Sequence, residues 1–598
     1  MLELASELGQ KAAAALAAHL GSPPDFPVEL TVVRAGKPEF GDLQISGCLQ
    51  LAKQHQRPPR ELAERVASAL RGHAALTKVE VAGPGFVNLH LANGWLAAHL
   101  AKRAEDPKLG LRPIGQGQRL VIDFSSPNVA KPMHIGHLRS TIIGDALQRT
   151  LRALGYEVIA DNHLGDWGTQ FGKLIVAYRR WLDAAAYAAD PVAELLRLYV
   201  KFGEEEEQQR GEHGRASPGE AEEETGPAPP ILEEARRELV KLQAGDPENR
   251  ALWQKFIADS RHVFAAVYER LGVRFDHWLG ESAYHAMLPR VVEDLTGRGI
   301  AVESRGAKVV FLEEEKLPPF IVQKSDGGYN YATTDIATLA VRTGVPPWAY
   351  MPAGPFDAQR VLVVTDERQQ LHFKQLFAVG RRLGITASLE HVWFGLMRMA
   401  EGTIKTREGN VIHLAELLDE AERRATRAAG EHNPDLGEAE RKEIGRVVGL
   451  GAVKYNDLSK DRQTLVTFSW DKALSLDGNT APYLQYAYAR ICSILRKADP
   501  SPSRAAIELT LPTERDLALR LLAFPEAVEQ VGRSARPHLL CDYLFELATT
   551  FSNFYASAPV LKAETAPLRA SRLALTALVA RTLREGLGLL GIEVLDRM

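Results

Sequence analysis

A short run of the chain places a strand, a polar loop and a helix one after another around two histidines. Residues 120–124 have the length and pattern of a short buried strand, with Asp123 as their single polar residue, and apolar residues recur at helical spacing after His137 until Gly155. Residues 156–160 then have the pattern of a second strand. Strand, helix and strand make a βαβ unit, whose first turn and helix N-terminus favour a nucleotide phosphate. The sequence therefore predicts an α/β domain with a nucleotide site at this turn.

The tetrapeptide His134-Ile135-Gly136-His137 has residue types that suit such a site. Gly136 allows the backbone to approach a bound nucleotide closely. Imidazole donors at His134 and His137 can hydrogen-bond phosphates and follow the charge onto a pyrophosphate leaving group. The structural alternative is two surface histidines around a turn, and the strand-to-helix context favours the functional interpretation.

Length and composition restrict the class of protein. A chain of 598 residues predicts three or four domains, and its 45% hydrophobic and 25% charged content is ordinary. The net charge of −4 gives no global sign of nucleic-acid binding, although a local basic surface is enough for RNA contact. Neither a membrane span nor a secretory signal is predicted. The three cysteines form no CxxC pair, so we expect no disulfide framework, no zinc site and a cytoplasmic location.

The segment from Ser125 to Thr141 resembles the signature of class I aminoacyl-tRNA synthetases, specifically arginyl-tRNA synthetases. Similarity to that family extends over nearly the whole chain. It implies a class I Rossmann-like catalytic domain with insertions, an N-terminal α/β tRNA-binding domain and an all-α C-terminal anticodon-binding bundle. Residues 38–42 and 83–88 resemble the family's N-terminal domain, which contacts the D-arm of tRNA.

The resemblance divides the chain into four parts. Residues 1–112 correspond to the N-terminal domain, and 113–410 to the catalytic domain with a connective insertion at about 173–318. Residues 411–470 form a helical linking region, and 471–598 a DALR-type anticodon-binding domain. Within the insertion, residues 204–230 are rich in Glu, Gly and Pro, which predicts a solvated, disordered segment.

Local patterns predict the main elements of these domains. We expect strands near residues 30–33, 360–365 and 393–399, a strand pair near 79–91, and a helix near 44–53. Residues 321–331 have the pattern of a β-hairpin turning at Asp-Gly-Gly, and the chain is predicted to be helical from about residue 414 to its end.

The family's second phosphate-binding element is a mobile loop with two lysines. Thr403 to Arg407 resemble this loop, and they imply ATP contacts from Lys405, Thr406 and Arg407. Thr406 stands where the loop's second lysine belongs, and the resemblance implies that Lys131, before the histidines, substitutes for it. A lysine is a mobile point charge that can serve a phosphate from either side. Taken alone, Lys405 and Arg407 are typical of a solvated turn.

A guanidinium substrate requires a carboxylate, another acceptor and an aromatic face. Tyr331 and Asp335 lie four residues apart and share one face if a helix begins there, with Thr333 or Thr334 as its cap. They resemble the family's arginine-binding pair, although Asp335 alone is equally typical of a helix start.

Other substrate contacts come from the resemblance alone. Asp123 and Asn128, with His134, correspond to residues that hold the substrate's α-amino and carboxylate end. Gln369 corresponds to the side-chain-binding glutamine, and its neighbour Gln370 leaves the register open by one residue.

Together these motifs predict an arginine–tRNA ligase that uses ATP with Mg²⁺, L-arginine and tRNA(Arg), and acts as a cytoplasmic monomer. Three alternatives remain open at this point. They are another class I synthetase, a small-molecule nucleotidyl transferase with the same histidine motif, and a non-catalytic tRNA-binding protein.

Overall fold

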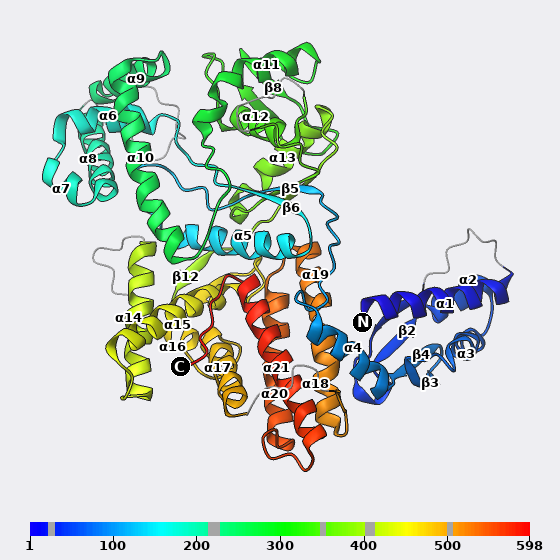
Figure 1. Cartoon of the computed structure of the whole chain (residues 1–598). Coiled ribbons are helices and arrows are strands. Elements are labelled where there is room, and N and C mark those ends of the chain that lie inside the picture. The colour runs from blue at the N-terminus through cyan, green and yellow to red at the C-terminus, as the bar shows by residue number, and fades with distance from the viewer. Residues whose placement is uncertain (22–29, 213–227, 347–353, 401–412, 499–505) are drawn as a thin grey trace.

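The computed structural model describes residues 1–21, 30–212, 228–346, 354–400, 413–498 and 506–598 (Figure 1). The N-terminal unit is drawn in blue, the insertion in cyan and green, and the C-terminal helices in yellow to red. Helix α5 (Ile135–Ala153) lies between the catalytic sheet and the C-terminal half, since it contacts strands of that sheet and four helices of the C-terminal half. The histidine motif therefore begins a helix whose core is shared by the catalytic sheet and the C-terminal helices.

The N-terminal unit is an antiparallel sheet covered by helices. It comprises α1 (Leu2–Leu20), β1 (Thr31–Arg34), β2 (Leu43–Ser46), α2 (Cys48–His55), α3 (Pro59–Leu70), β3 (Leu76–Ala82), β4 (Phe86–Leu91) and α4 (Asn93–Glu105), with strand order β1-β2-β4-β3. The predicted strands are confirmed. The predicted helix from Gln44 is wrong at its start, because the buried Leu43 and Ile45 alternate with half-buried neighbours at strand period and the helix begins at Cys48.

The catalytic sheet is parallel, with strand order β11-β10-β5-β6. Its strands are β5 (Arg119–Asp123), β6 (Glu157–Asp161), β10 (Arg360–Val363) and β11 (Ser388–His391), and its helices include α12 (Tyr331–Thr343) and α13 (Gln370–Arg382). The predicted βαβ unit is confirmed. The first and second halves of the domain meet where β5 pairs with β10, and open α/β sheets bind ligands at such a switch point.

The insertion is mostly helical. It contains α6 (Gln170–Trp181), α7 (Ala184–Ala189), α8 (Pro191–Glu212), α9 (Pro230–Gln243), α10 (Pro247–Arg270), the 3₁₀ helix η2 (Glu281–Met287), α11 (Leu288–Gly297), and the antiparallel strands β7 (Val302–Ser304), β8 (Ala307–Val310) and β9 (Phe320–Gln323).

The predicted disorder of residues 204–230 is wrong at both ends. Residues 204–212 complete α8, and Pro230 begins α9. The glutamates are tolerated because Glu206 pairs with Lys173 at 2.6 Å and with Arg210 at i+4, and Gln209 accepts a hydrogen bond from the Ile231 amide. The remaining part of the prediction, 213–227, lies outside the described residues.

The predicted hairpin at 321–331 is half correct. Its turn forms, with the Lys324 amide donating to the Gly328 carbonyl, but the partner of β9 is β8 and the chain enters α12 at Tyr331. Neither threonine caps this helix. The N-cap is Asn330, and the Thr333 hydroxyl donates instead to the carbonyl of Val322.

The C-terminal half is helical apart from two short strands. Its elements are β12 (Met397–Met399), α14 (Leu414–His432), α15 (Glu438–Leu458), β13 (Val466–Phe468), α16 (Trp470–Ala473), α17 (Ala481–Lys497), α18 (Pro512–Leu522), α19 (Phe524–Ser534), α20 (His538–Ser557) and α21 (Ala566–Leu589). The prediction of helix throughout is wrong at β13, which pairs in parallel with β12. The predicted strand at 393–399 is confirmed only for its last three residues.

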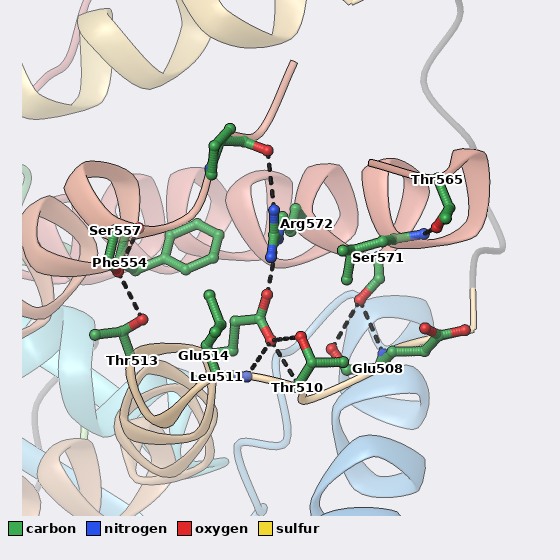
Figure 2. Close-up of polar contacts among 12 residues, drawn as sticks. Glu508, Thr510, Leu511, Thr513, Glu514, Phe554, Ser557, Thr565, Ser571 and Arg572 are labelled. Carbon is green, nitrogen blue, oxygen red and sulfur yellow. Dashed lines mark hydrogen bonds and ion pairs between the residues drawn. The ribbon is translucent and has the colours of Figure 1, made fainter. Parts of the chain in front are cut away.

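A buried ion pair joins α18 to α21 within the bundle (Figure 2). Glu514 contacts Arg572 at 2.8 Å, and it also accepts hydrogen bonds from the amides of Thr510 and Leu511 at 2.6 and 2.9 Å. One carboxylate therefore satisfies the N-terminus of α18 and the guanidinium at once, which makes burial of both charges tolerable.

Polar contacts also fix the N-terminal unit on the bundle. Arg515 of α18 forms a two-pronged ion pair with Asp42, with both contacts at 2.7 Å. Arg112 forms a second two-pronged pair with the buried Glu529 of α19, at 2.7 and 2.8 Å. Two-pronged arginine–carboxylate pairs restrict orientation as well as distance.

Packing of α5 on the sheet generates a stability prediction. A Cβ at Gly144 would lie 2.2 Å from the Phe124 ring, whereas a Cβ at the exposed helical Gly588 would meet nothing within 4 Å. We expect Gly144→Ala to lower the free energy of unfolding by about 1–3 kcal/mol. Gly588→Ala should raise it by up to about 1 kcal/mol. Thermal unfolding of both variants checks this, and equal melting temperatures would contradict the close packing of helix on strand.

Candidate active site

The two histidines form a cap at the N-terminus of α5. His134 is the N-cap residue, and its Nδ1 accepts a hydrogen bond from the Gly136 amide at 3.0 Å. Nδ1 of His137 accepts from the His134 amide at 3.1 Å. Because each Nδ1 is an acceptor, each neutral ring carries its proton on Nε2. The site therefore presents two Nε2–H donors beside a helix N-terminus.

Gly136 is needed for this cap. A Cβ at this position would lie 2.8 Å from Cε1 of His134, so any side chain would displace the ring that caps the helix. Its role in the structure is to leave room for the His134 ring.

Both histidines are held neutral. Burial lowers the pKa of His137 to about 3, with a further contribution from His134. Burial also lowers the pKa of His134, and the neighbouring His413 and Arg368 add to the effect. Near pH 7 the pair consequently acts through hydrogen bonding rather than through positive charge.

The predicted phosphate loop residues Lys405, Thr406 and Arg407 lie outside the described residues. The chain that follows them is anchored at the histidines. His413 forms a backbone bridge with His134, and the Leu414 amide donates to the Met133 carbonyl at 2.8 Å. His413 and Leu414 thus lie beside the N-terminus of α5.

Lys131 is not directed at the histidines in this structure. Its ammonium group lies 4.6 Å from the ring centroid of Tyr199 on α8 of the insertion. This cation–π contact was not apparent from the sequence, because Tyr199 is remote along the chain.

Asp123, at the end of β5, is buried with partners on both oxygens. Oδ1 accepts from the Ser126 hydroxyl at 2.8 Å, and Oδ2 contacts Arg342 at 2.8 Å. Arg342 also contacts the fully buried Asp161 at the end of β6, again at 2.8 Å. One guanidinium from α12 thus joins the ends of two strands, a role that sequence spacing did not reveal.

Asn128 lies exposed on the approach loop. The backbone of Asn128 forms a β-bridge with Gly165. A Cβ added at Gly165 would lie 2.1 Å from Oδ1 of Asn128. The glycine-rich loop after β6 therefore packs directly against Asn128 and fixes where its amide is presented.

Tyr331 and Asp335 lie one turn apart on α12, as predicted, and His372 of α13 brings them together. Nε2 of His372 contacts Oδ2 of Asp335 at 2.6 Å, and its ring centroid lies 4.9 Å from that of Tyr331. Tyr331 is 64% exposed, so its ring is open to a ligand. Gln369 is also exposed and ends the 3₁₀ helix η3 (Glu367–Gln369), while Gln370 begins α13.

Glu281 is a further carboxylate of this region that the sequence did not indicate. Burial raises its pKa to about 7, His163 opposes the rise, and Asp335 and Asp166 add to it. A strongly shifted carboxyl group beside another acidic residue is typical of a binding site for a cation. No spacing pattern marks Glu281, because it lies in the 3₁₀ helix η2 and far along the chain from Asp335.

Arg139 connects the histidine helix to the segment before the phosphate loop. It is fully buried, and its Nε lies 2.8 Å from Oδ1 of the equally buried Asp457 on α15. Its other nitrogens donate to the carbonyls of Gly395, Leu396, Arg462 and Thr464. These carbonyls flank β12 and β13, so a single side chain two residues after His137 fixes the strand that leads to residue 401.

The described part of the chain was searched for metal sites and for membrane-spanning helices. There, no group of three or more His, Cys, Asp or Glu side chains is arranged to hold a metal ion. Among the same residues, no helix combines the length and apolar character needed to cross a membrane.

Comparison with known proteins identifies each part of the chain. The model for tRNA synthetases class I (R), catalytic domain, matches residues 104–470. The arginyl tRNA synthetase N terminal domain matches residues 4–91, and the DALR anticodon binding domain matches 484–598.

Similar proteins span the full length. An arginine–tRNA ligase of Fusobacterium nucleatum is 44% identical, over 96% of this chain and 95% of the relative. An arginine–tRNA ligase of Alteromonas mediterranea is 45% identical, over 95% of this chain and 96% of the relative. The arginyl-tRNA synthetase structure from Thermus thermophilus aligns with TM-score 0.80 and 28% identity over 100% of both chains. That from Plasmodium falciparum aligns with TM-score 0.81 and 26% identity, over 100% of this chain and 99% of the other.

These matches confirm the fold class predicted from the sequence, since all three predicted kinds of domain are found. With a class I catalytic domain between two accessory domains and full-length relatives above 40% identity, the chain belongs to the arginyl-tRNA synthetases, a family of aminoacyl-tRNA ligases.

Proposed function

We propose that this protein activates L-arginine with ATP to arginyl-adenylate and transfers the arginyl group to the 3′-terminal adenosine of tRNA(Arg). One observation carries the assignment beyond family membership. His372 ties Asp335 to the segment after β10, and the shifted Glu281 lies close enough to sense its charge. This contact and this pKa shift support a site in which Asp335 and Glu281 bind the guanidinium while His134 and His137 donate to the phosphates.

In the first step, the arginine carboxylate attacks the α-phosphorus of ATP, and the bond to the bridging oxygen of pyrophosphate breaks. The Nε2–H groups of His134 and His137 donate to phosphate oxygens that gain charge in the transition state. Lys405, Thr406 and Arg407 are assigned to the phosphates on the resemblance alone. Positioning and electrostatics supply the rate, and no side chain forms a covalent intermediate.

In the second step, the 2′-hydroxyl of the terminal adenosine attacks the carbonyl carbon of the adenylate. The ester bond to the tRNA forms, the bond to the phosphate breaks, and AMP leaves with the electron pair. The hydroxyl proton is passed to the departing phosphate or to water.

Lys131 is proposed to serve the phosphates by rotating away from Tyr199. The flexible four-carbon stem of a lysine permits this movement, and a surface cation–π contact is weak enough to break. The α-amino and carboxylate end of arginine is proposed to bind Asn128, Asp123 and His134, all of which lie on the loop from β5 to α5 or at its ends. Gln369 is proposed to contact the side chain.

Selectivity for arginine follows from the carboxylates. A guanidinium offers a planar fork of donors to Asp335 and Glu281, with the face of Tyr331 available for stacking. Lysine has a point charge without the fork, and a neutral side chain brings no charge to Asp335 and Glu281, so both form weaker contacts there than a guanidinium does.

Mg²⁺ is proposed to arrive with ATP as the counter-ion of its phosphates, since among the described residues no side-chain group is arranged as a metal site. A role in translation places the protein in the cytoplasm, and we propose that it acts as a monomer. Residues 1–112 and 471–598 are proposed to contact the D-arm and the anticodon of tRNA, with 113–410 catalytic and 411–470 linking.

The first prediction of the proposed function concerns arginine itself. Arginine-dependent ATP–pyrophosphate exchange, measured with and without tRNA(Arg), should occur in the wild type and not with lysine. Asp335→Asn should lower kcat/KM for arginine roughly 100-fold or more while leaving KM for ATP within about twofold. Glu293→Gln, which removes an exposed charge from the same domain, is the matched control. Lack of arginine-dependent exchange by folded wild-type protein would overturn the proposed function.

The second prediction concerns pH. Because the pKa of Glu281 is raised to about 7, its binding form is lost as pH falls through neutrality. KM for arginine should therefore rise roughly tenfold between about pH 8 and about pH 6. Glu281→Gln should have a high KM that hardly changes over this range. A variant with the wild-type pH profile would show that Glu281 does not bind the guanidinium.

A further inference from the structure

A three-residue segment after β6, residues 164–166, lies between the two ends of the candidate arginine site. On one side it contacts the approach loop that carries Asn128, and on the other it contacts the start of η2, which carries Glu281. All three residues of this spacer segment are buried. Since Asn128 is proposed to hold the α-amino and carboxylate end of arginine and Glu281 the guanidinium, one short segment supports both ends.

On the side of the approach loop, the contacts come from the backbone of Gly165. Its amide donates to the Pro127 carbonyl at 3.2 Å, and its carbonyl accepts from the Val129 amide at 3.1 Å. A side chain is excluded at this position, because an added Cβ would lie 2.1 Å from Oδ1 of Asn128. The residues on both sides of Asn128 are therefore hydrogen-bonded to one glycine.

On the other side, the spacer segment satisfies the N-terminus of η2. The N-cap residue of this helix is Gly280, which has no side chain to bind the free amides. The Glu281 amide donates instead to the Leu164 carbonyl at 3.0 Å. The amide and the hydroxyl of Ser282 donate to the two carboxylate oxygens of Asp166, at 2.8 and 2.7 Å. Asp166 therefore supplies the cap that the helix's own sequence lacks.

Asp166 has little freedom to move. It is 6% exposed, and a Cβ added at Gly280 would lie 2.2 Å from its carboxylate carbon. Its backbone carbonyl is also bound, since Nε1 of Trp253 on α10 donates to it at 2.8 Å. A buried carboxylate needs hydrogen-bond donors on its oxygens, and Ser282 supplies one to each. The start of η2 is therefore fixed relative to the spacer segment.

We propose that Asp166 is a positioning residue that sets the length of the amino acid that the site accepts. The inference rests on the proposed function, in which Asn128 and Glu281 hold opposite ends of arginine. The residues that support them are neighbours in the chain, and the Cα atoms of neighbouring residues are about 3.8 Å apart. Few bonds therefore separate the two ends of the site, and a side chain longer or shorter by one methylene would fit only one end at a time.

The test is direct binding of three guanidinium amino acids that differ only in chain length. L-Arginine, homoarginine with one more methylene, and the homologue with one methylene fewer are titrated calorimetrically against the full chain, with tRNA(Arg) present and ATP absent. Wild type is compared with Asp166→Asn and Asp166→Ala. Asparagine keeps an acceptor for the Ser282 amide and can donate to its hydroxyl, whereas alanine removes both contacts.

Asp183→Ala is the matched control. Asp183 is exposed and caps α7 in the insertion by accepting from the amides of Ala185 and Ala186, at 2.9 and 3.0 Å. Its removal thus also takes an aspartate cap from a helix, but this helix carries no proposed ligand of arginine. Circular dichroism verifies that each variant is folded.

We expect wild type and Asp183→Ala to bind arginine roughly tenfold or more tightly than either homologue. Asp166→Ala should raise Kd for arginine roughly tenfold and reduce the preference over homoarginine to within about threefold, whereas Asp166→Asn should keep most of the preference. A preference that survives Asp166→Ala, or that is lost equally in Asp183→Ala, would overturn the proposal. If Asp166→Ala does not fold, Ser282→Ala removes the hydroxyl contact alone, and an unchanged preference in that variant overturns the proposal.

A double-variant cycle tests whether Asp166 acts through Glu281. In protein that already carries Glu281→Gln, Asp166→Ala should weaken arginine binding by less than about twofold, because the contact that Asp166 positions has been removed. Additive losses would show that Asp166 affects binding independently of Glu281, which contradicts a positioning role.

These outcomes are separable from failure of the proposed function, because binding is measured without ATP. If wild type binds arginine with a length preference that depends on Asp166 but shows no arginine-dependent pyrophosphate exchange, the positioning role stands and the catalytic assignment falls. If exchange occurs and the preference does not depend on Asp166, only the positioning role is wrong. Folded wild type that binds no arginine overturns both.

Discussion

The buried ion pair between Arg139 and Asp457 is the interaction on which the rest of the candidate active site depends. A charge with no solvent contact is costly unless it is paired, and Arg139 lies 2.8 Å from Asp457 and donates to four backbone carbonyls. Burial raises the pKa of Asp457 to about 6, and Arg139 opposes that rise. Loss of either partner would leave the other charge buried alone.

The position of Arg139 explains its importance. It lies two residues after His137, and its carbonyl partners flank β12 and β13. Arg462, one of those partners, donates in turn to the Ala535 carbonyl between α19 and α20. Arg139 and Arg462 consequently hold the histidine pair, strand β12 and the C-terminal bundle in one fixed relation. Arg342 does the same for the strand ends, by joining Asp123 to Asp161.

Sequence reasoning found those parts of the site that a local pattern specifies. The strand–loop–helix order around His134 and the four-residue spacing of Tyr331 and Asp335 both reflect the periods of regular structure. It gave no sign of Glu281, which we propose as the second carboxylate of the arginine site, because a single carboxylate in a 3₁₀ helix follows no periodic pattern. It also missed the pairing of Lys131 with Tyr199, which depends on how the insertion folds back.

Errors in the predicted elements have similar causes. Residues 204–212 were assigned to a disordered segment from their composition, yet their charges pair at helical spacing and with Lys173. Strand β13 is too short to stand out from a helical background and exists because β12 pairs with it. Local composition describes what a segment prefers, whereas these outcomes were decided by contacts between distant segments.

The most direct test of the account is a crystal structure with a non-hydrolysable analogue of arginyl-adenylate. The account predicts that the guanidinium lies between Asp335 and Glu281, against the Tyr331 ring, and that Nε2 of His134 and His137 face the phosphate position and its adenosine. A guanidinium bound elsewhere, or a nucleotide that does not contact the N-terminus of α5, would contradict it.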